Sequence, residues 1–183
     1  MRDISLHILD IAENSLRAGA SLIAVDVRID QANDTLTVEI DDNGCGMSKE
    51  MVQRVKSPFT TSRTTRNVGL GISLFAAGCE STGGSLEIES EPGVGTKLKA
   101  AYRNSHIDRP PLGDIAGTIS ALVITNPEID FVFTAEKDDT FEFDTREVKA
   151  TLGEVPITEP EVINFIRDYL SEGTKQVFGG EQQ

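Results

Sequence analysis

Four short motifs follow one another within the first hundred residues, and their order constrains the fold of this chain more than any other feature. Asn14 lies in an apolar-periodic segment, and the turn at residues 42–46 (DNGCG) begins 28 residues later. Residues 69–71 (GLG) and Gly95-Thr96 complete the series. An amide oxygen suits a hard cation such as magnesium, and glycine turns let the backbone approach a ligand closely. The set predicts a pocket for a magnesium-bound nucleotide.

The spacing of apolar residues predicts an alternation of helices and strands around these motifs. Asp3 is a helix cap, and Ile4, Ile8 and Ile11 follow at helical spacing until Gly19 ends the helix. The further elements expected in this half are strands at 21–29 and 35–40, a short helix after Ser48, an apolar helix from 69 to 83, and a hairpin formed by 86–88 and 96–98.

The second half predicts a smaller module. Residues 104–111 carry paired prolines and are expected to be a linker between an N-terminal domain, 1–103, and an α+β module, 112–178. That module is expected to contain a helix from Asp114, a hairpin with an aromatic face at 129–143, and a helix begun by a capping box at 158–161. Residues 179–183 are expected to be a frayed tail.

The charge is negative and unevenly distributed. The formal net charge is −13, of which residues 1–102 contribute −4 and residues 103–183 contribute −9. An acidic second half argues against nucleic acid and against anionic membrane as partners. Cys45 and Cys79 are expected to be small, buried free thiols in a reducing cytoplasm, because two cysteines cannot form a disulfide scaffold. No apolar run approaches about 20 residues, so a cytoplasmic protein is expected.

Taken together, the four motifs resemble those of the GHKL superfamily of ATP-binding domains, which includes gyrase B, the heat-shock chaperone ATPase, histidine kinases and the mismatch-repair MutL proteins. The resemblance covers residues 3–102. It implies an α+β fold, a two-layer α/β sandwich of the Bergerat type, whose mixed and mostly antiparallel sheet has helices on one face. It implies ATP and Mg²⁺ as ligands.

The resemblance assigns roles to the first helix. Asn14 is implied to be the magnesium ligand, and Arg17 is implied to meet phosphate. Asp10, one helical turn before Asn14, matches the position of a catalytic glutamate in hydrolysing relatives. Because aspartate is one methylene shorter, two roles stay open, a catalytic carboxylate or an outer partner for the metal's waters. Residues 13–20 resemble the mismatch-repair version of this motif.

The same resemblance makes Asp42 the reader of adenine. Its carboxylate can accept a hydrogen bond from the exocyclic amino group, which guanine lacks at that position. Gly44 and Gly46 are implied to let the backbone pass close to the base and ribose. Thr96 is implied to support the aspartate and the base through water.

Residues 57–74 resemble a histidine-kinase lid followed by the second glycine motif. The backbone amides of Gly69, Leu70 and Gly71 open a helix, where the helix dipole favours phosphate. The preceding hydroxyl-rich loop supplies the other implied phosphate contacts, namely Thr61, Arg63 and Arg66.

Three functions follow from the resemblance. The first is a signal-transduction kinase that transfers the γ-phosphoryl group to a partner protein in trans, which the short, hydroxyl-rich lid favours. The second is an ATP-gated binding module or slow ATPase, and the third is an adenine-nucleotide sensor. These other two are favoured by the short Asp10 side chain and by the missing phosphoacceptor, since His7 and His106 are poor candidates and no phosphoacceptor helix precedes the asparagine helix. In each case residues 112–178 are expected to bind the partner protein or to form a homodimer.

Overall fold

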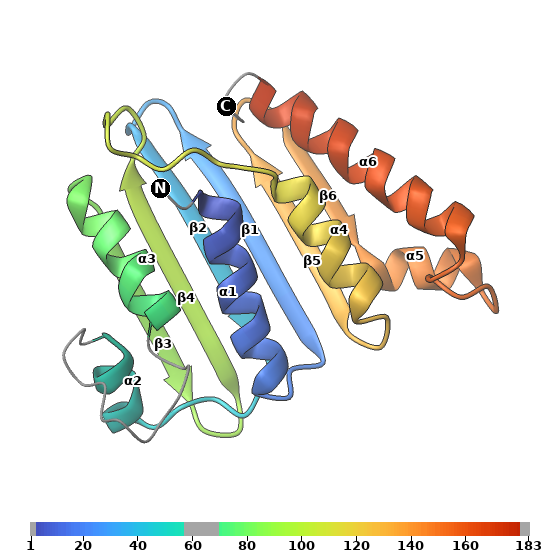
Figure 1. Cartoon of the computed structure of the whole chain (residues 1–183), viewed down its shortest axis with the longest axis horizontal. Coiled ribbons are helices and arrows are strands. Elements are labelled where there is room, and N and C mark those ends of the chain that lie inside the picture. Colours follow the sequence, from blue (N-terminus) through green and yellow to red (C-terminus); the bar gives the residue numbers. More distant parts are fainter. Residues whose placement is uncertain (1–2, 57–69, 180–183) are drawn as a thin grey trace.

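The protein has two layers, a six-stranded mixed sheet and a layer of helices on one of its faces (Figure 1). The computed structural model describes residues 3–56 and 70–179. The strand order is β3-β4-β2-β1-β5-β6, and α3, α1, α4 and α6 pack side by side across the sheet in that order. The α+β sandwich expected from the sequence is confirmed.

Helix α1, Ile4–Arg17, begins and faces inward as its sequence predicts. The Asp3 carboxylate accepts a hydrogen bond from the Leu6 N–H at 3.0 Å, which satisfies one of the free amides of the first turn. Ile4, Ile8 and Ile11 recur at helical spacing, and all three are buried against the sheet.

The strands of the N-terminal half form an antiparallel sheet with one buried face. They are β1, Leu22–Asp30, β2, Thr35–Asp42, β3, Ser85–Glu91, and β4, Gly95–Arg103. Strand β2 pairs with β1 on one side and with β4 on the other, and β3 pairs with β4. Alternate residues such as Val25, Val38 and Leu98 enter the core, because successive side chains of a strand point to opposite faces.

Two helices complete the N-terminal half. They are α2, Lys49–Lys56, and α3, Leu70–Ser81. Ser48 precedes α2 as expected, and its hydroxyl accepts from the Met51 N–H at 3.3 Å. On α3, Phe75 is fully buried and stacks against His7 of α1 with ring centroids 4.7 Å apart. This stacking joins α1 to α3.

Residues 112–178 extend the same sheet. Their elements are α4, Ile115–Thr125, β5, Asp130–Glu136, β6, Thr140–Asp144, α5, Thr145–Leu152, and α6, Pro160–Phe178. Strand β5 pairs in parallel with β1, and β6 pairs antiparallel with β5. The expected aromatic hairpin is thereby confirmed. The division of the chain into two folding units stays a prediction.

The segment that leads from β4 to α4 is fixed to the N-terminal half. The Ile4 N–H donates to the Pro111 carbonyl at 2.9 Å, and the Ser5 N–H donates to the Leu112 carbonyl at 2.9 Å. The Leu112 side chain is fully buried. The expected linker therefore runs across the start of α1 in contact with it.

One sequence prediction about α6 is wrong. The residue that caps α6 is Glu159, whose side chain makes no capping hydrogen bond, so Thr158 does not form the expected capping box. Pro160 at the first helical position starts the helix instead, because its fixed φ angle suits the first turn and its missing N–H would have no helical partner there. None of the helices in residues 3–56 and 70–179 is long and apolar enough to cross a lipid bilayer.

Candidate nucleotide-binding site

The candidate site lies where the end of β2 meets the C-terminal half of α1. Asp42 is the last residue of β2, and its carboxylate is held by two donors. The Ser15 hydroxyl of α1 donates to Asp42 Oδ2 at 2.6 Å, and the Gly44 N–H donates to Asp42 Oδ1 at 2.9 Å. A carboxylate oxygen accepts more than one hydrogen bond, so the fixed group keeps capacity for a ligand donor.

The turn that follows Asp42 is clamped between α1 and the β3–β4 hairpin. The Cys45 N–H donates to the Ala18 carbonyl at 2.9 Å, and the Cys45 carbonyl accepts from the Gly93 N–H at 2.8 Å. Gly46 has a φ of +65°, and a Cβ atom there would collide with the backbone carbonyl of Glu91. Glycine is therefore required at position 46 by conformation and by space together.

Thr96 lies beside Asp42, and a second hydroxyl fixes it. Thr96 of β4 is the cross-strand partner of Asp42 on β2. The Thr96 and Ser90 hydroxyl oxygens are 2.8 Å apart and share a hydrogen bond. The Ser90 hydroxyl also accepts from the Met47 N–H at 2.8 Å, which ties the turn to β3.

Asn43 anchors the turn to the start of β1. Its Oδ1 atom accepts from the Ser21 and Leu22 N–H groups at 2.8 and 2.9 Å, and its Nδ2 atom donates to the Ser21 hydroxyl at 2.9 Å. These three bonds fix the residue next to Asp42. Asn43 therefore positions the carboxylate through the backbone.

The residues expected to meet metal and phosphate lie along α1. Asn14 Oδ1 accepts from Arg17 Nη1 at 3.1 Å, and Arg17 Nη2 pairs with Glu13 at 2.9 Å. Asp10, one turn before Asn14, faces the start of α3, since a Cβ atom placed on Gly71 would lie 3.4 Å from the Asp10 Cβ atom. Among the described residues, no group of three or more His, Cys, Asp or Glu side chains could hold a metal ion.

A cavity of about 230 Å³ joins these groups. Asp42, Thr96 and Asn14 all lie on its wall, together with Arg17 and Gly46. The remainder is mostly apolar and consists of Ile11, Ser15, Ala18, Ile40, Cys45, Met47, Met51, Ile72, Ile88 and Leu98. An apolar slot with one oriented carboxylate at its wall is the arrangement that a flat heteroaromatic base requires.

The structure places some of the predicted site residues and leaves others outside its description. It brings Asn14, Asp42 and Thr96 together on one cavity. The predicted phosphate contacts Thr61, Arg63, Arg66 and Gly69 lie outside the described residues. Leu70 begins α3, and Gly71 follows it in that helix.

Sequence analysis missed three positioning residues, Ser15, Asn43 and Ser90. Asn43 is part of the DNGCG motif, so the motif itself was the available signal. The only sequence signal for Ser15 was its position next to Asn14. Ser90 had no sequence signal, because its partner depends on the register of the β3–β4 hairpin.

The two cysteines differ, which corrects the expectation that both are buried. Cys45 is exposed and lies on the wall of the cavity. Cys79 of α3 is fully buried, and burial raises the pKa of its thiol to about 11. Only Cys45 is therefore placed to report on ligand binding through its reactivity.

The chain is similar in sequence to parts of several curated bacterial proteins, among them a sensor protein and a sporulation kinase. A segment of 117 residues is 31% identical to the non-motile and phage-resistance protein of Caulobacter vibrioides, covering 59% of this chain and 14% of that protein. A segment of 91 residues is 28% identical to the sensor protein DegM of a Bacillus species, covering 50% of this chain and 24% of that protein. Another 91-residue segment is 31% identical to sporulation kinase D of Bacillus subtilis, covering 50% of this chain and 18% of that protein. The chain thus matches less than a quarter of each relative's length.

Comparison with solved structures supports the fold. The MutL ATPase domain of Aquifex aeolicus, complexed with ADP, superposes with a TM-score of 0.53 at 15% identity, covering 92% of this chain and 88% of that one. The N-terminal domain of a DNA repair protein superposes with a TM-score of 0.51 at 13% identity, covering 79% of this chain and 52% of that one. Because the first likeness covers 92% of this chain, it extends past residue 104.

The family profile described as histidine kinase-, DNA gyrase B-, and HSP90-like ATPase matches residues 2–104. That range holds α1, all four strands of the N-terminal half, and every described residue of the candidate site. The chain therefore belongs to this family of GHKL ATPases and carries its ATP-binding domain.

Proposed function

We propose that the protein binds ATP with the adenine in the apolar cavity and its exocyclic amino group against Asp42. The observation that carries the proposal is the orientation of the Asp42 carboxylate, which Ser15 and Gly44 hold in place at the cavity wall. A carboxylate accepts from adenine's amino group, whereas the carbonyl of guanine at that position would face it with a second acceptor. ATP is therefore preferred over GTP.

Asn14 would hold a magnesium ion that is carried in by the triphosphate. Magnesium keeps several waters and binds through few protein ligands, so one amide oxygen completed by phosphate oxygens suits it. Asn14 Oδ1 already accepts from Arg17 and has a second lone pair for the metal. Arg17, which is largely exposed, would turn to the phosphates. The ion supplies charge neutralisation at the γ-phosphate when it is bound.

For chemistry we propose transfer of the γ-phosphoryl group to a partner protein in trans. The bond between the γ-phosphorus and its bridging oxygen breaks, the acceptor's nucleophile bonds to the phosphorus, and ADP leaves with the electron pair. The named kinases among the relatives support a kinase over the other functions. His7 does not suit the acceptor role, because its ring is buried between α1 and α3.

Asp10 would orient the acceptor or take up its proton. It lies one turn before Asn14, so both side chains project from the same face of α1. Its proximity to Gly71 places it beside the start of α3, the helix end at which the phosphates are expected.

The second candidate function is an ATP-gated binding module that hydrolyses ATP slowly or only senses it. The short side chain at position 10 favours this candidate, because aspartate reaches about 1.5 Å less far than glutamate. In that case Asp10 would orient the waters of the metal, and the response to ATP would be a change in docking onto a partner.

Transfer of label separates these candidates. The protein is incubated with γ-labelled ATP, alone and with proteins from its host, and the label is followed. Label on a second protein supports the kinase, free phosphate supports the ATPase, and unchanged ATP supports the sensor. Asp10→Asn should abolish turnover and leave ATP affinity unchanged if Asp10 acts on the acceptor. The matched control Asp138→Asn lies in the β5–β6 turn and should change neither.

Calorimetry tests the magnesium assignment. Asn14→Ala should remove the part of the ATP affinity that depends on magnesium, so that adding Mg²⁺ no longer strengthens binding. Asn33→Ala, in the turn between β1 and β2, is the matched control and should keep the full magnesium effect. If Asn14→Ala bound Mg-ATP like the wild type, Asn14 would not be the ligand.

A further inference from the structure

A groove of about 490 Å³ lies at the far edge of the sheet, between β6 with α5 on one side and α6 on the other. Its floor and walls are apolar, and both helices contribute. Val148 and Leu152 are four residues apart on α5, and Val162, Phe165 and Tyr169 follow at helical spacing on α6. Phe165 is 58% exposed and Tyr169 is 43% exposed. Two helical apolar faces thus meet, and no third element among residues 3–56 and 70–179 covers them.

The aromatic wall of this groove is held from behind. Phe165 and Tyr169 stack with their ring centroids 5.7 Å apart. The Tyr169 ring in turn lies 5.1 Å from the ring of Phe141, whose strand β6 belongs to the sheet. A partner that docks here meets a surface that is already ordered, which lowers the entropy cost of binding.

The rim of the groove is acidic. Glu142, Glu147 and Glu161 line it and are exposed, and none of them has a salt bridge among the described residues. The fourth carboxylate, Asp144, is already paired with Arg146. No lysine or arginine of the described part of the chain lines the groove.

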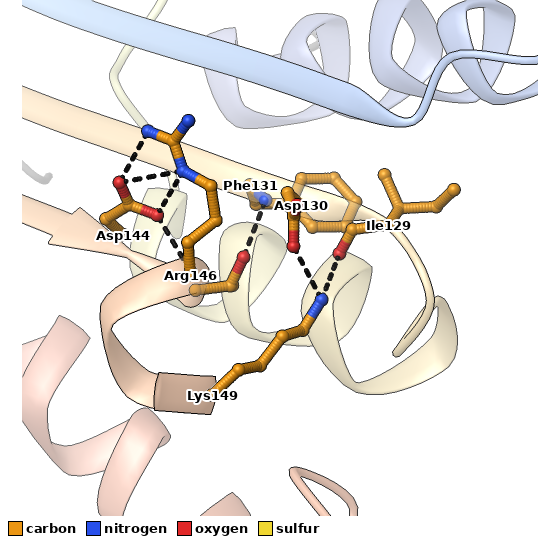
Figure 2. A network of polar contacts seen from close by, with 7 residues as sticks. Ile129, Asp130, Phe131, Asp144, Arg146 and Lys149 are labelled. Atoms are coloured by element: carbon orange, nitrogen blue, oxygen red, sulfur yellow. Dashed lines mark hydrogen bonds and ion pairs between the residues drawn. The ribbon is translucent and has the colours of Figure 1, made fainter. Parts of the chain in front are cut away.

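The basic residues of α5 are turned to the strands, as Figure 2 shows. Lys149 Nζ donates to Asp130 Oδ1 at 2.7 Å and to the Ile129 carbonyl at 3.1 Å. Arg146 Nη2 donates to Asp144 Oδ2 at 2.6 Å, and this guanidinium holds the pKa of the Asp144 carboxyl below its usual range. The Phe131 N–H donates to the Thr145 hydroxyl at 2.8 Å. These bonds fix α5 on the sheet and leave its acidic and apolar residues for the groove.

We propose that this acidic groove, defined by Glu142, Glu147, Glu161, Phe165 and Tyr169, binds an amphipathic helix of a partner protein that carries apolar anchors flanked by lysine or arginine. The two apolar helix faces suit a third helix laid between them. Charge complementarity selects the partner. A second copy of this chain would bring its own acidic rim to the groove, and nucleic acid and anionic membrane would be repelled. The proposal does not depend on the proposed nucleotide chemistry.

The test uses the full chain and a fluorescent 18-residue helical peptide with leucines on one face and lysines beside them. A second peptide carries glutamate in place of lysine, and a third has the leucines spread around the helix. Fluorescence anisotropy without ATP should give binding of the first peptide at least about tenfold tighter than of either other peptide. The binding should weaken with salt.

Two variants and two matched controls assign the binding to the groove. Phe165→Ala and the double change Glu147→Lys with Glu161→Lys should each weaken the affinity for the lysine peptide about tenfold or more. Ile107→Ala removes another exposed apolar side chain, and Glu87→Lys with Glu89→Lys makes the same charge change on β3. Both controls should bind the peptide like the wild type.

Three results would overturn the proposal. One is equal binding, or no binding, of the lysine and glutamate peptides. Another is an equal effect of the groove variants and their controls, which would mean non-specific attraction. The third is self-association in sedimentation that Phe165→Ala abolishes, because the groove would then hold a second copy. A loss of ATP binding with peptide binding intact would count against the nucleotide site alone.

Discussion

Ser15→Ala is the substitution that most sharply probes how the site is organised. The Ser15 hydroxyl donates to Asp42 Oδ2 at 2.6 Å from a side chain that is 2% exposed. Alanine is smaller and fits the same helical position without a clash. The change therefore removes one of the two donors that hold the carboxylate and leaves the other, the Gly44 N–H, in place.

The magnitude follows from that one bond. A hydrogen bond to a charged group contributes about 1.5–3 kcal/mol. Because Gly44 still restrains Asp42, we expect about 1–2 kcal/mol of ATP affinity to be lost, which is a weakening of about 5- to 30-fold. The free energy of unfolding should fall by a similar amount.

The assay is calorimetric titration with Mg-ATP, accompanied by urea denaturation of each variant. Ser120→Ala is the matched control, since Ser120 is also a buried helical serine but donates to the Gly117 carbonyl of its own helix. It should bind ATP like the wild type. Wild-type affinity in Ser15→Ala, or an equal loss in both variants, would refute the role given to Ser15.

Three further predictions concern the turn, the thiols and α5. Gly46→Ala should abolish ATP binding, because position 46 has a φ of +65° and the new Cβ atom would collide with backbone. Position 93 has a φ of +78° but open space for a Cβ atom, so Gly93→Ala should lower the free energy of unfolding, measured by denaturation, by only about 1–2 kcal/mol. Cys45 should react rapidly with a disulfide reagent at pH 8, and ATP should slow this reaction. Cys79 should react only when the protein unfolds. Rapid reaction of both thiols, or no protection of Cys45 by ATP, would contradict this prediction. Asp144→Asn should lower stability by about 1 kcal/mol at neutral pH, since the half-exposed Arg146 is screened by solvent. Arg146 lowers the pKa of Asp144 in the folded protein, so this stabilisation is present above the ordinary carboxyl pKa of 3.8 and is lost as the pH falls through the lowered pKa. The stabilities of the wild type and Asp144→Asn should therefore converge in acid. A difference in stability that stays constant with pH would argue against the ion pair.

Some residues of the candidate site could be named from the sequence because each has a local feature that stands out. Asn14 is a mid-helix amide, Asp42 is a carboxylate in a glycine turn, and Gly46 is a glycine at which the backbone can approach a ligand closely. Ser15 could not be identified in the same way. Its hydroxyl can hold the Asp42 carboxylate only because α1 crosses the end of β2, and this crossing belongs to the tertiary structure.

The same distinction applies to the fold. The strands at 130–136 and 140–144 were predictable from their alternation, and their turn from Asp138 and Asp139. The pairing of β5 with β1 was not predictable, because alternation shows that a strand has a buried face without showing which strand lies beside it. Helix α5 was missed because it begins directly after β6, at Thr145, with no turn residue between them.

Calorimetric titration of the wild type and Asp42→Asn with ATP and with GTP, in the presence of magnesium, tests the central claim most directly. The account predicts that the wild type binds one ATP per chain and discriminates against GTP. The variant, which keeps the shape of the side chain but not its charge, should lose at least about tenfold in ATP affinity and most of the discrimination. Absence of saturable heat with the wild type, or unchanged ATP affinity in Asp42→Asn, would contradict the account.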